Sequence, residues 1–192
     1  MWAQISQESF PRRETTDIRR DIFTYWESTT YTDLRWLAYI LATAYRETVG
    51  TMQPVREGLC KSDECSIQKV TAHVGATKVK DNYSLPDRNG RSYFGRGFVQ
   101  ITHKRNYKRV GQALGWGDEL VNKPELALDR QKAIPILVEG STRGLFTGKK
   151  LGDCFNDKES NWIGARKVVN PGSKRARIPA EHGKDFYSCF VS

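Results

Sequence analysis

The apolar segment at residues 34–45 is the feature that most constrains how this chain can fold. It reads LRWLAYILATAY, and its apolar residues recur at spacings of three and four. Asp33, directly before it, is a residue type that caps helix N-termini, and Gly50 is typical of a helix end. A helix that is apolar on most of its faces has to be covered by other elements. We therefore expect a helix here, at the centre of the fold.

Helical spacing of apolar residues also predicts most of the other elements. Two of the further helices end at a glycine, one begins after Asp129 and should be kinked by Pro135, and two lie in the last third of the chain. The predicted helices cover residues 62–75, 103–115, 130 onward, 162–169 and 178–190. The pattern therefore indicates a mainly helical protein.

One short strand is expected, at residues 93–102, after the turn sequence PDRNG. Alternation along it would place Phe98, Gln100 and Thr102 on one face. The predicted fold class is mainly α with a minor β element (α+β). We expect a single domain of residues 1–192, in which a helical lobe and a smaller lobe, around residues 51–105, share a groove.

The composition is that of an ordinary globular protein. The 192 residues are 38% hydrophobic and 28% charged, and residues 34–45 fall well short of the roughly 20 apolar residues that span a bilayer. The first residues lack the features of a secretory signal peptide. The net charge of +9 favours polyanionic partners without deciding between nucleic acid, anionic lipid and an acidic cell envelope.

Four cysteines allow a disulfide framework. Pairs of Cys60 with Cys65 and Cys154 with Cys189 are one of three connectivities, and they would indicate an oxidising site of action. Unpaired core thiols are the commoner alternative. A zinc site built from Cys60, Cys65 and His73 lacks the usual two-residue cysteine spacing and a fourth ligand, so we expect no metal.

Two acids lie close together in the sequence in different settings. Glu47 ends the apolar helix, where the helix dipole and burial both favour a protonated carboxyl. Glu57 lies in an irregular stretch beside Arg56, where a carboxylate stays solvated and ionised. Two carboxyls with opposite preferences suit acid and base catalysis. The alternative is structural: an exposed acid at a helix end, and a loop acid paired with Arg56.

Residues 93–107, YFGRGFVQITHKRNY, carry polar groups on a glycine-rich turn. Glycines at 95 and 97 would let the backbone approach a ligand closely. Gln100 and Asn106 can hydrogen-bond acetamido and hydroxyl groups, and the Thr102 hydroxyl can hold a water. The third glycine of a dinucleotide-binding G-x-G-x-x-G is absent, which excludes that interpretation.

The motif FGRG followed by QITH and NY resembles the groove motif of glycoside hydrolase family 19, which contains chitinases and related phage endolysins. Residues 44–50, AYRETVG, are similar to that family's H-E-T-G-G segment. The resemblance implies that Glu47 is the general acid. Arg46 replaces the histidine of the pattern and Val49 replaces its first glycine.

The resemblance assigns roles to further residues. The PVRE sequence at 54–57 is similar to the endolysin branch, which places the second acid on Glu57, and the water-positioning hydroxyl falls on Thr102. The VVNPG sequence at 168–172 is similar to the loop that closes the family's groove, and Arg166 is a candidate partner for a site carboxylate. The implied substrate-binding residues are Tyr93, Arg96, Gln100, Asn106, Arg166 and Asn170.

The resemblance implies a lysozyme-like fold and hydrolysis of β-1,4 bonds between N-acetylmuramic acid and N-acetylglucosamine, with inversion. Glu47 would protonate the leaving oxygen, and Glu57 would activate a water held with Thr102. Peptidoglycan is the first expected substrate and chitin the alternative. We expect a monomer without cofactor, made in the cytoplasm without a signal peptide and acting on the cell wall in the periplasm or outside the cell. An inhibitor or immunity protein would be a further partner.

A rival interpretation is a non-catalytic module. It would be either a wall-binding protein with an inactive site or a nucleic-acid binder that uses the basic run KRAR at residues 174–177 and exposed aromatic residues. Such binding would weaken steeply with salt and would not depend on Glu47. The three histidines, His73, His103 and His182, show no spacing to a nucleophile that would indicate a serine or cysteine hydrolase. We expect glycan strands, and not nucleic acid, as the partner, because the family resemblance implies a glycan substrate.

Overall fold

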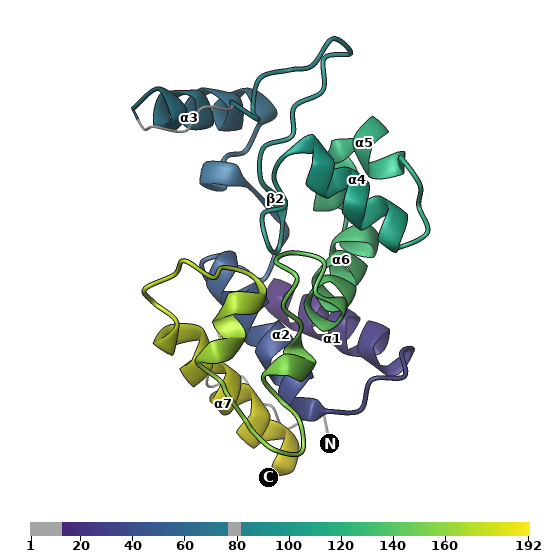
Figure 1. Cartoon of the computed structure of the whole chain (residues 1–192), viewed down its shortest axis with the longest axis vertical. Helices are drawn as coiled ribbons and strands as arrows, with labels where there is room; N and C mark the ends of the chain where they lie inside the picture. Colours follow the sequence, from purple (N-terminus) through teal and green to yellow (C-terminus); the bar gives the residue numbers. More distant parts are fainter. Residues whose placement is uncertain (1–12, 77–81) are drawn as a thin grey trace. The chain divides into compact units, whose positions relative to one another are not determined.

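The computed structural model describes residues 13–76 and 82–192, and its elements are labelled in Figure 1. The chain forms two compact units. The first contains the residues up to Gln53 together with Ser141–Ser192, and the second contains Pro54–Gly140. The second unit begins close to the start of the lobe expected at residues 51–105 and continues well past its end.

The centre of the first unit is helix α2 (Leu34–Glu47), as the sequence predicted. Asp33 caps it by accepting a hydrogen bond from the Arg35 backbone N–H, and residues 37–44 are buried without interruption. Helix α7 (Arg177–Val191) packs against α2 although it lies near the other end of the chain (Figure 1). An element buried all round requires such cover on more than one side.

Helix α1 (Arg13–Glu27) also packs on α2 and was not predicted. Its buried residues are Ile18, Ile22 and Trp26, spaced by four along the helix. This stripe is narrow, and charged residues surround it in the sequence. Few apolar positions recur at helical spacing, so the pattern was too weak to identify the helix.

The last third of the chain is less helical than expected. It contains the 3₁₀ turns η4 (Leu151–Asp153) and η5 (Gly164–Val168), and η5 replaces the longer helix predicted at residues 162–169. Trp162, just before η5, belongs to an aromatic cluster that anchors this segment on the first unit. The rings that contact it are those of Tyr39, Phe155 and Tyr187.

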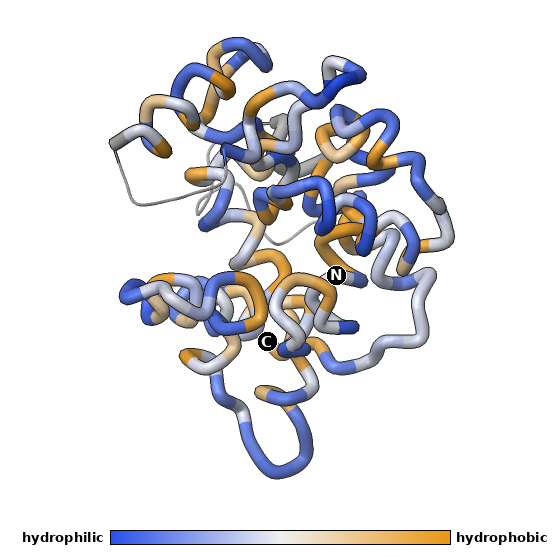
Figure 2. The backbone as a smooth tube through the Cα atoms, turned by 45° about the horizontal axis from the view of Figure 1, so that its top comes forward, coloured by the Kyte–Doolittle hydropathy of each residue, from blue (hydrophilic) through white to orange (hydrophobic). Residues whose placement is uncertain are grey.

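The second unit contains short helices joined by turns, and its last helix, α6, extends beyond it. Helices α3 and α4 match their predicted ranges within two residues, and Asp129 caps α6 by accepting from the Gln131 backbone N–H. Helix α6 continues past Pro135. Figure 2 shows hydrophobic and hydrophilic residues alternating along the helical turns, as expected for helices that bury one face. The elements are η2 (Glu57–Leu59), α3 (Asp63–Ala76), α4 (Lys104–Ala113), α5 (Glu119–Asn122), η3 (Pro124–Leu128) and α6 (Arg130–Arg143).

The β element is much shorter than predicted. Strand β1 (Val55–Arg56) pairs antiparallel with β2 (Arg96–Gly97), and the chain then turns so that Arg96 pairs again with Ile101. Gly97 and Gln100 have positive φ angles, 89° and 53°, which an extended strand cannot contain. The expectation that Phe98, Gln100 and Thr102 share one strand face was therefore wrong.

One of the two possible disulfides forms. Cys60 and Cys65 are bonded, whereas Cys154 is a buried free thiol and Cys189 an exposed one, so the second predicted pair is wrong. The bonded sulfurs cannot also ligate zinc through thiolates, and no cluster of ligating side chains that could hold a metal occurs within residues 13–76 and 82–192. None of the helices in these ranges is long and apolar enough to cross a membrane.

Gly97 is expected to be the glycine on which the β turn depends most. A Cβ there would lie 2.9 Å from the Ala127 carbonyl oxygen, on a backbone with φ of 89°. Gly97→Ala should lower the free energy of unfolding by about 2–3 kcal/mol in urea denaturation. Gly90→Ala is the control, because Gly90 has φ of 76° but no atom within 4 Å of its Cβ position. It should lose only about 1 kcal/mol, and equal losses would show that the contact with Ala127 is unimportant.

Candidate active site

Glu47 and Arg166 form an ion pair within the first unit. Glu47 is the last residue of α2, and its Oε1 lies 2.6 Å from Arg166 Nη1, which η5 supplies. The arginine side chain is 8% exposed and the glutamate side chain 19%. This is the contact with a site carboxylate that the sequence predicted for Arg166. The pair fixes the carboxylate of Glu47 at the end of α2.

Glu57 is held by two donors within the second unit. Its Oε1 accepts from Tyr83 Oη at 2.8 Å, and its Oε2 accepts from the Gly95 backbone N–H at 2.7 Å. Burial of Tyr83 and its hydrogen bond to the carboxylate both raise the pKa of that tyrosine. The Tyr83 ring packs on the His103 ring with centroids 4.5 Å apart. The sequence predicted a solvated carboxylate at Glu57, whereas the structure holds it by two internal hydrogen bonds.

The structural alternative required Glu57 to pair with Arg56, and this pair does not form. Arg56 Nε instead lies 2.7 Å from Asp63 Oδ1. The carboxylate of Glu57 is occupied by neutral donors, the phenol of Tyr83 and the amide of Gly95.

The glycine-rich turn makes its close contacts within the protein. A Cβ on Gly95 would lie 2.8 Å from Gln100 Oε1 and 3.2 Å from Glu57 Oε2. Gln100 Nε2 donates to the carbonyls of Val55 at 2.8 Å and Gly97 at 3.1 Å. Glycine is thus needed here for packing around Glu57, and the Gln100 amide hydrogens already hold the β turn.

Thr102 and Asn106 meet at the start of α4. Asn106 Nδ2 donates to the Thr102 carbonyl at 2.7 Å, and its Oδ1 accepts from Arg109 at 3.2 Å. Both Thr102 and Asn106 are half-buried. The Asn106 amide therefore ties the first turn of α4 to the residue before it, and the Thr102 hydroxyl stays available to meet a water.

Arg96 is buried in the second unit, 1% exposed. Its Nη2 lies 2.8 Å from Asp63 Oδ2, its Nη1 donates to the Ser92 carbonyl at 2.8 Å, and its guanidinium lies 3.6 Å from the centre of the Phe94 ring. All of these contacts are internal. The geometry therefore favours a structural role for Arg96, in place of the substrate contact that the sequence suggested.

Tyr93 is likewise buried, at 4% exposure. Its Oη lies 3.2 Å from Asp87 Oδ2 and 3.1 Å from the Val121 carbonyl oxygen, and its ring meets that of Tyr107. A ring enclosed in this way does not present its face to a sugar. The geometry therefore favours a role for Tyr93 in the core of the second unit, in place of the substrate contact that the sequence suggested.

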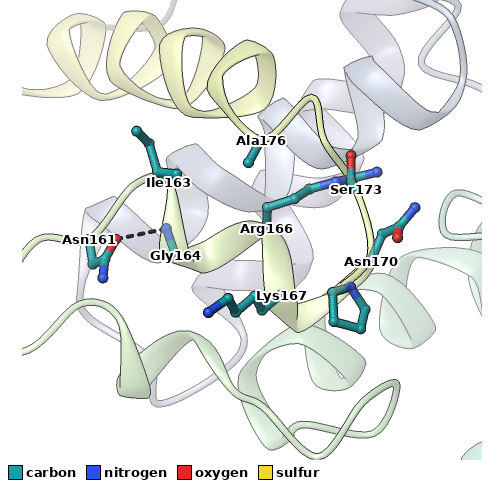
Figure 3. A pocket seen from close by; sticks show the side chains of 9 residues that line it. Asn161, Ile163, Gly164, Arg166, Lys167, Asn170, Ser173 and Ala176 are labelled. Carbon is teal, nitrogen blue, oxygen red and sulfur yellow. Dashed lines mark hydrogen bonds between the residues drawn. The ribbon is translucent and has the colours of Figure 1, made fainter.

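Asn170 lies with Arg166 on a cavity of about 300 Å³ in the first unit. The cavity is formed by η5 and the segment that follows it, and further lining groups include Asn161 and Ser173. Figure 3 shows the Arg166 side chain extending toward Ser173 and Asn170. The structure therefore brings Asn170 together with Arg166, the partner of Glu47.

The chain matches the family model described as Chitinase class I over residues 23–134, which is more than half of its length. The chain belongs to this family. The match includes both acids and the whole of residues 93–107.

Curated members of the family match over limited stretches. Chitinase 1 of Oryza sativa subsp. japonica is 30% identical over 92 residues, which are 48% of this chain and 28% of that protein. A basic endochitinase of Vitis vinifera is 34% identical over 97 residues, 50% of this chain and 30% of that protein. An acidic 26 kDa endochitinase of Solanum lycopersicum is 59% identical over 34 residues, which are 18% of this chain and 13% of that protein. The alignments thus span less than a third of each relative.

Solved chitinases share the fold along nearly the whole chain. Chitinase C from Streptomyces griseus HUT6037 superposes with a TM-score of 0.57 at 18% identity, covering 96% of this chain and 87% of that one. A mutant of chitinase C gives the same TM-score and identity, with coverages of 95% and 85%. The mainly helical, lysozyme-like fold with a small sheet is therefore the one predicted.

The turn after Glu47 shows why this family's motif has a glycine where the chain has Val49. Val49 has φ of 53° and is exposed, a conformation that glycine adopts without steric cost and that strains a β-branched residue. Thr48 holds the turn, since its Oγ1 donates to the Ala44 carbonyl at 2.7 Å and accepts from the Met52 N–H at 2.9 Å. Thr48 thus ties the turn both to α2 and to the residues that follow it.

Sequence reasoning missed Tyr83 and Asp63. Tyr83 lies 26 residues from Glu57, outside both motifs, and Asp63 looked like an ordinary first-turn acid of a helix. No local pattern links either residue to its partner. Only the tertiary fold brings them together.

Asp63 is expected to make the second unit sensitive to acid. Burial opposes its ionisation, but hydrogen bonds from Arg56 and Arg96 hold the pKa of Asp63 below its ordinary value. A lowered pKa contributes stability above the unfolded-state pKa, and this stability is lost as the pH falls through the folded-state pKa, below about 4. Asp63→Asn should lower the free energy of unfolding at pH 7 by about 2 kcal/mol, because it leaves Arg96 buried without a countercharge.

The measurement is urea unfolding at pH values from 7 to 3. The variant should lose less stability than the wild type over the acidic part of this range. Glu125→Gln, at an exposed position in the same unit, is the control and should follow the wild type. Identical pH profiles for all three proteins would contradict the role assigned to Asp63.

Proposed function

We propose that this chain is a glycoside hydrolase that cleaves β-1,4 bonds between N-acetylated amino sugars with inversion. The observation that carries the proposal is that the family match at residues 23–134 contains two acids that each have a dedicated internal partner. These partners are Arg166 for Glu47 and Tyr83 for Glu57. Acids fixed in this way suit proton transfer, which depends on positioning.

Glu47 in its protonated form would donate to the leaving oxygen. Once the proton has gone, the guanidinium of Arg166 at 2.6 Å stabilises the carboxylate that remains. Glu57 would accept a proton from the attacking water, because its two donors hold the carboxyl group in one orientation. The Thr102 hydroxyl would hold that water. Inversion requires roughly 6.5–9.5 Å between the two carboxyl groups, to leave room for the water.

We propose peptidoglycan as the first substrate and chitin as the alternative. The matched relatives are named chitinases, which supports a polymer of N-acetylglucosamine. The net charge of +9 and the resemblance of residues 54–57 to the endolysin branch support the anionic bacterial wall. The site of action would then be the cell wall, in the periplasm or outside the cell, and the activity would be antibacterial.

Glu47→Gln and Glu57→Gln should each lower kcat by at least about 100-fold, since general acid–base catalysis contributes roughly 10²–10⁴-fold. Products from purified peptidoglycan and from chitin oligosaccharides are identified by mass spectrometry, and the first anomer formed is identified by NMR. Inversion of a β bond gives the α anomer. Glu181→Gln and Glu64→Gln, at exposed positions in the two units, should retain full activity.

The products decide between the substrates. Fragments ending in N-acetylmuramic acid identify a muramidase, and products from chitin alone identify a chitinase. A β anomer would contradict inversion. No product from either polymer, with binding that weakens steeply with salt, would favour the non-catalytic module and overturn the proposal.

Tyr83→Phe should lower kcat by about tenfold and leave KM within about twofold. The change removes one hydrogen bond to a carboxylate, worth roughly 1.5 kcal/mol, from a group that acts on water and not on substrate binding. Tyr187→Phe is the matched control, since Tyr187 packs through its ring against Trp162 in the first unit. A rise in KM with unchanged kcat would instead place Tyr83 in substrate binding.

A further inference from the structure

The cavity beside η5 has a buried polar atom with no partner. Arg166 is 7% exposed, and its Nε is buried without a hydrogen bond to any described residue. Nη1 of the same guanidinium is used by Glu47. A buried N–H left unpaired costs roughly 1–3 kcal/mol, so an acceptor supplied by a ligand would recover that free energy. Arg166 lines the cavity, so a small movement of its side chain would bring Nε within reach of such an acceptor.

The other polar groups of the cavity are suited to donate. Lys167 adds a second cation, and none of the described residues that line the cavity is acidic. The Asn161 oxygen already accepts from the Gly164 N–H, and the Ser173 oxygen accepts from the Arg175 N–H. Their remaining hydrogens are donors. Asn170 supplies a further amide, and Figure 3 shows it with Ser173 on the side toward which Arg166 extends, whereas Asn161 and the end of Lys167 lie on the other side of the cavity.

The size of the cavity limits the ligand to one small group. Its volume of about 300 Å³ is at the lower end of the range for small-molecule sites, roughly 300–1,000 Å³. A single substituent of a sugar fits this space better than several sugar rings. Arg166 already shares its charge with Glu47, so the selection for an anionic acceptor comes from Lys167, the neutral donors and a lining without an acid. A planar carboxylate matches a guanidinium edge well.

We propose that this cavity binds a carboxylate carried on a substituent of the glycan. The inference rests on the proposed function, since it assigns the cavity to the substrate of Glu47 and Glu57. Chitin is neutral and offers no such group. Peptidoglycan offers carboxylates on its stem peptides and, where the peptide has been removed, on the lactyl ether of N-acetylmuramic acid. The cavity would thus discriminate between the two substrates considered above.

The test is a binding measurement that does not depend on turnover. The probes are a soluble N-acetylglucosaminyl-N-acetylmuramyl tetrapeptide and the same molecule with its carboxyls converted to amides. Isothermal titration calorimetry on the whole chain should give at least tenfold tighter binding of the carboxylate form, a difference of about 1.4 kcal/mol. The ¹⁵Nε–¹H NMR signal of Arg166, assigned with Arg166→Lys, should shift with the carboxylate form and not with the amide.

Lys167→Met should reduce the ratio of the two affinities at least threefold. Lys158→Met removes the same charge at an exposed position outside the cavity and should leave the ratio unchanged. A peptide-free disaccharide and its amide form the second pair of probes. A preference for its carboxylate identifies the lactyl group as the ligand, and a preference confined to the tetrapeptide pair identifies the stem peptide.

Equal affinities for carboxylate and amide, or a ratio that Lys167→Met and Lys158→Met change alike, would overturn the inference. Both outcomes leave the hydrolysis assays untouched, so the proposed function would stand. If the charge preference and the Arg166 shift are found while no polymer is cleaved, the proposed hydrolysis fails and the carboxylate site remains.

Discussion

The ion pair between the buried Arg96 and Asp63 is the interaction on which the second unit depends most. A charge removed from water requires compensation, and Asp63, the Ser92 carbonyl and the Phe94 ring supply it. These contacts join α3 to the segment that leads into β2. Gly95 lies in that segment, and its N–H is one of the two donors to Glu57. The position of the predicted base therefore rests on an ion pair that does not touch it.

The two acids are supported by different physics. Glu47 depends on a charge, because a buried arginine pairs with it at a helix end. Glu57 depends on neutral donors, a phenol and a backbone amide. A partner that stabilises charge after proton loss suits an acid, and donors that fix orientation suit a base. This division would follow from the fold even though both side chains are glutamates.

Local patterns in the sequence predicted what local forces determine. The apolar run and Asp33 were sufficient to predict α2, and the spacing of Cys60 and Cys65 allowed the disulfide that forms. The strand was predicted too long because the left-handed conformation of Gln100 has no signature in its residue type. Arg96 was assigned to ligand binding because the sequence does not show burial. Tyr83 was missed because its partner is distant in the chain.

The division of the chain into units has a consequence for its synthesis. The second unit is continuous in sequence, whereas the first is assembled from two separate stretches whose helices α2 and α7 pack together. Contacts between distant segments form slowly, since a long loop has to close before they contribute. During translation the second unit can fold while α7 is still unmade, but α2 keeps its apolar surface uncovered until then. The interval between the synthesis of α2 and the synthesis of α7 is the time when this chain is most exposed to aggregation.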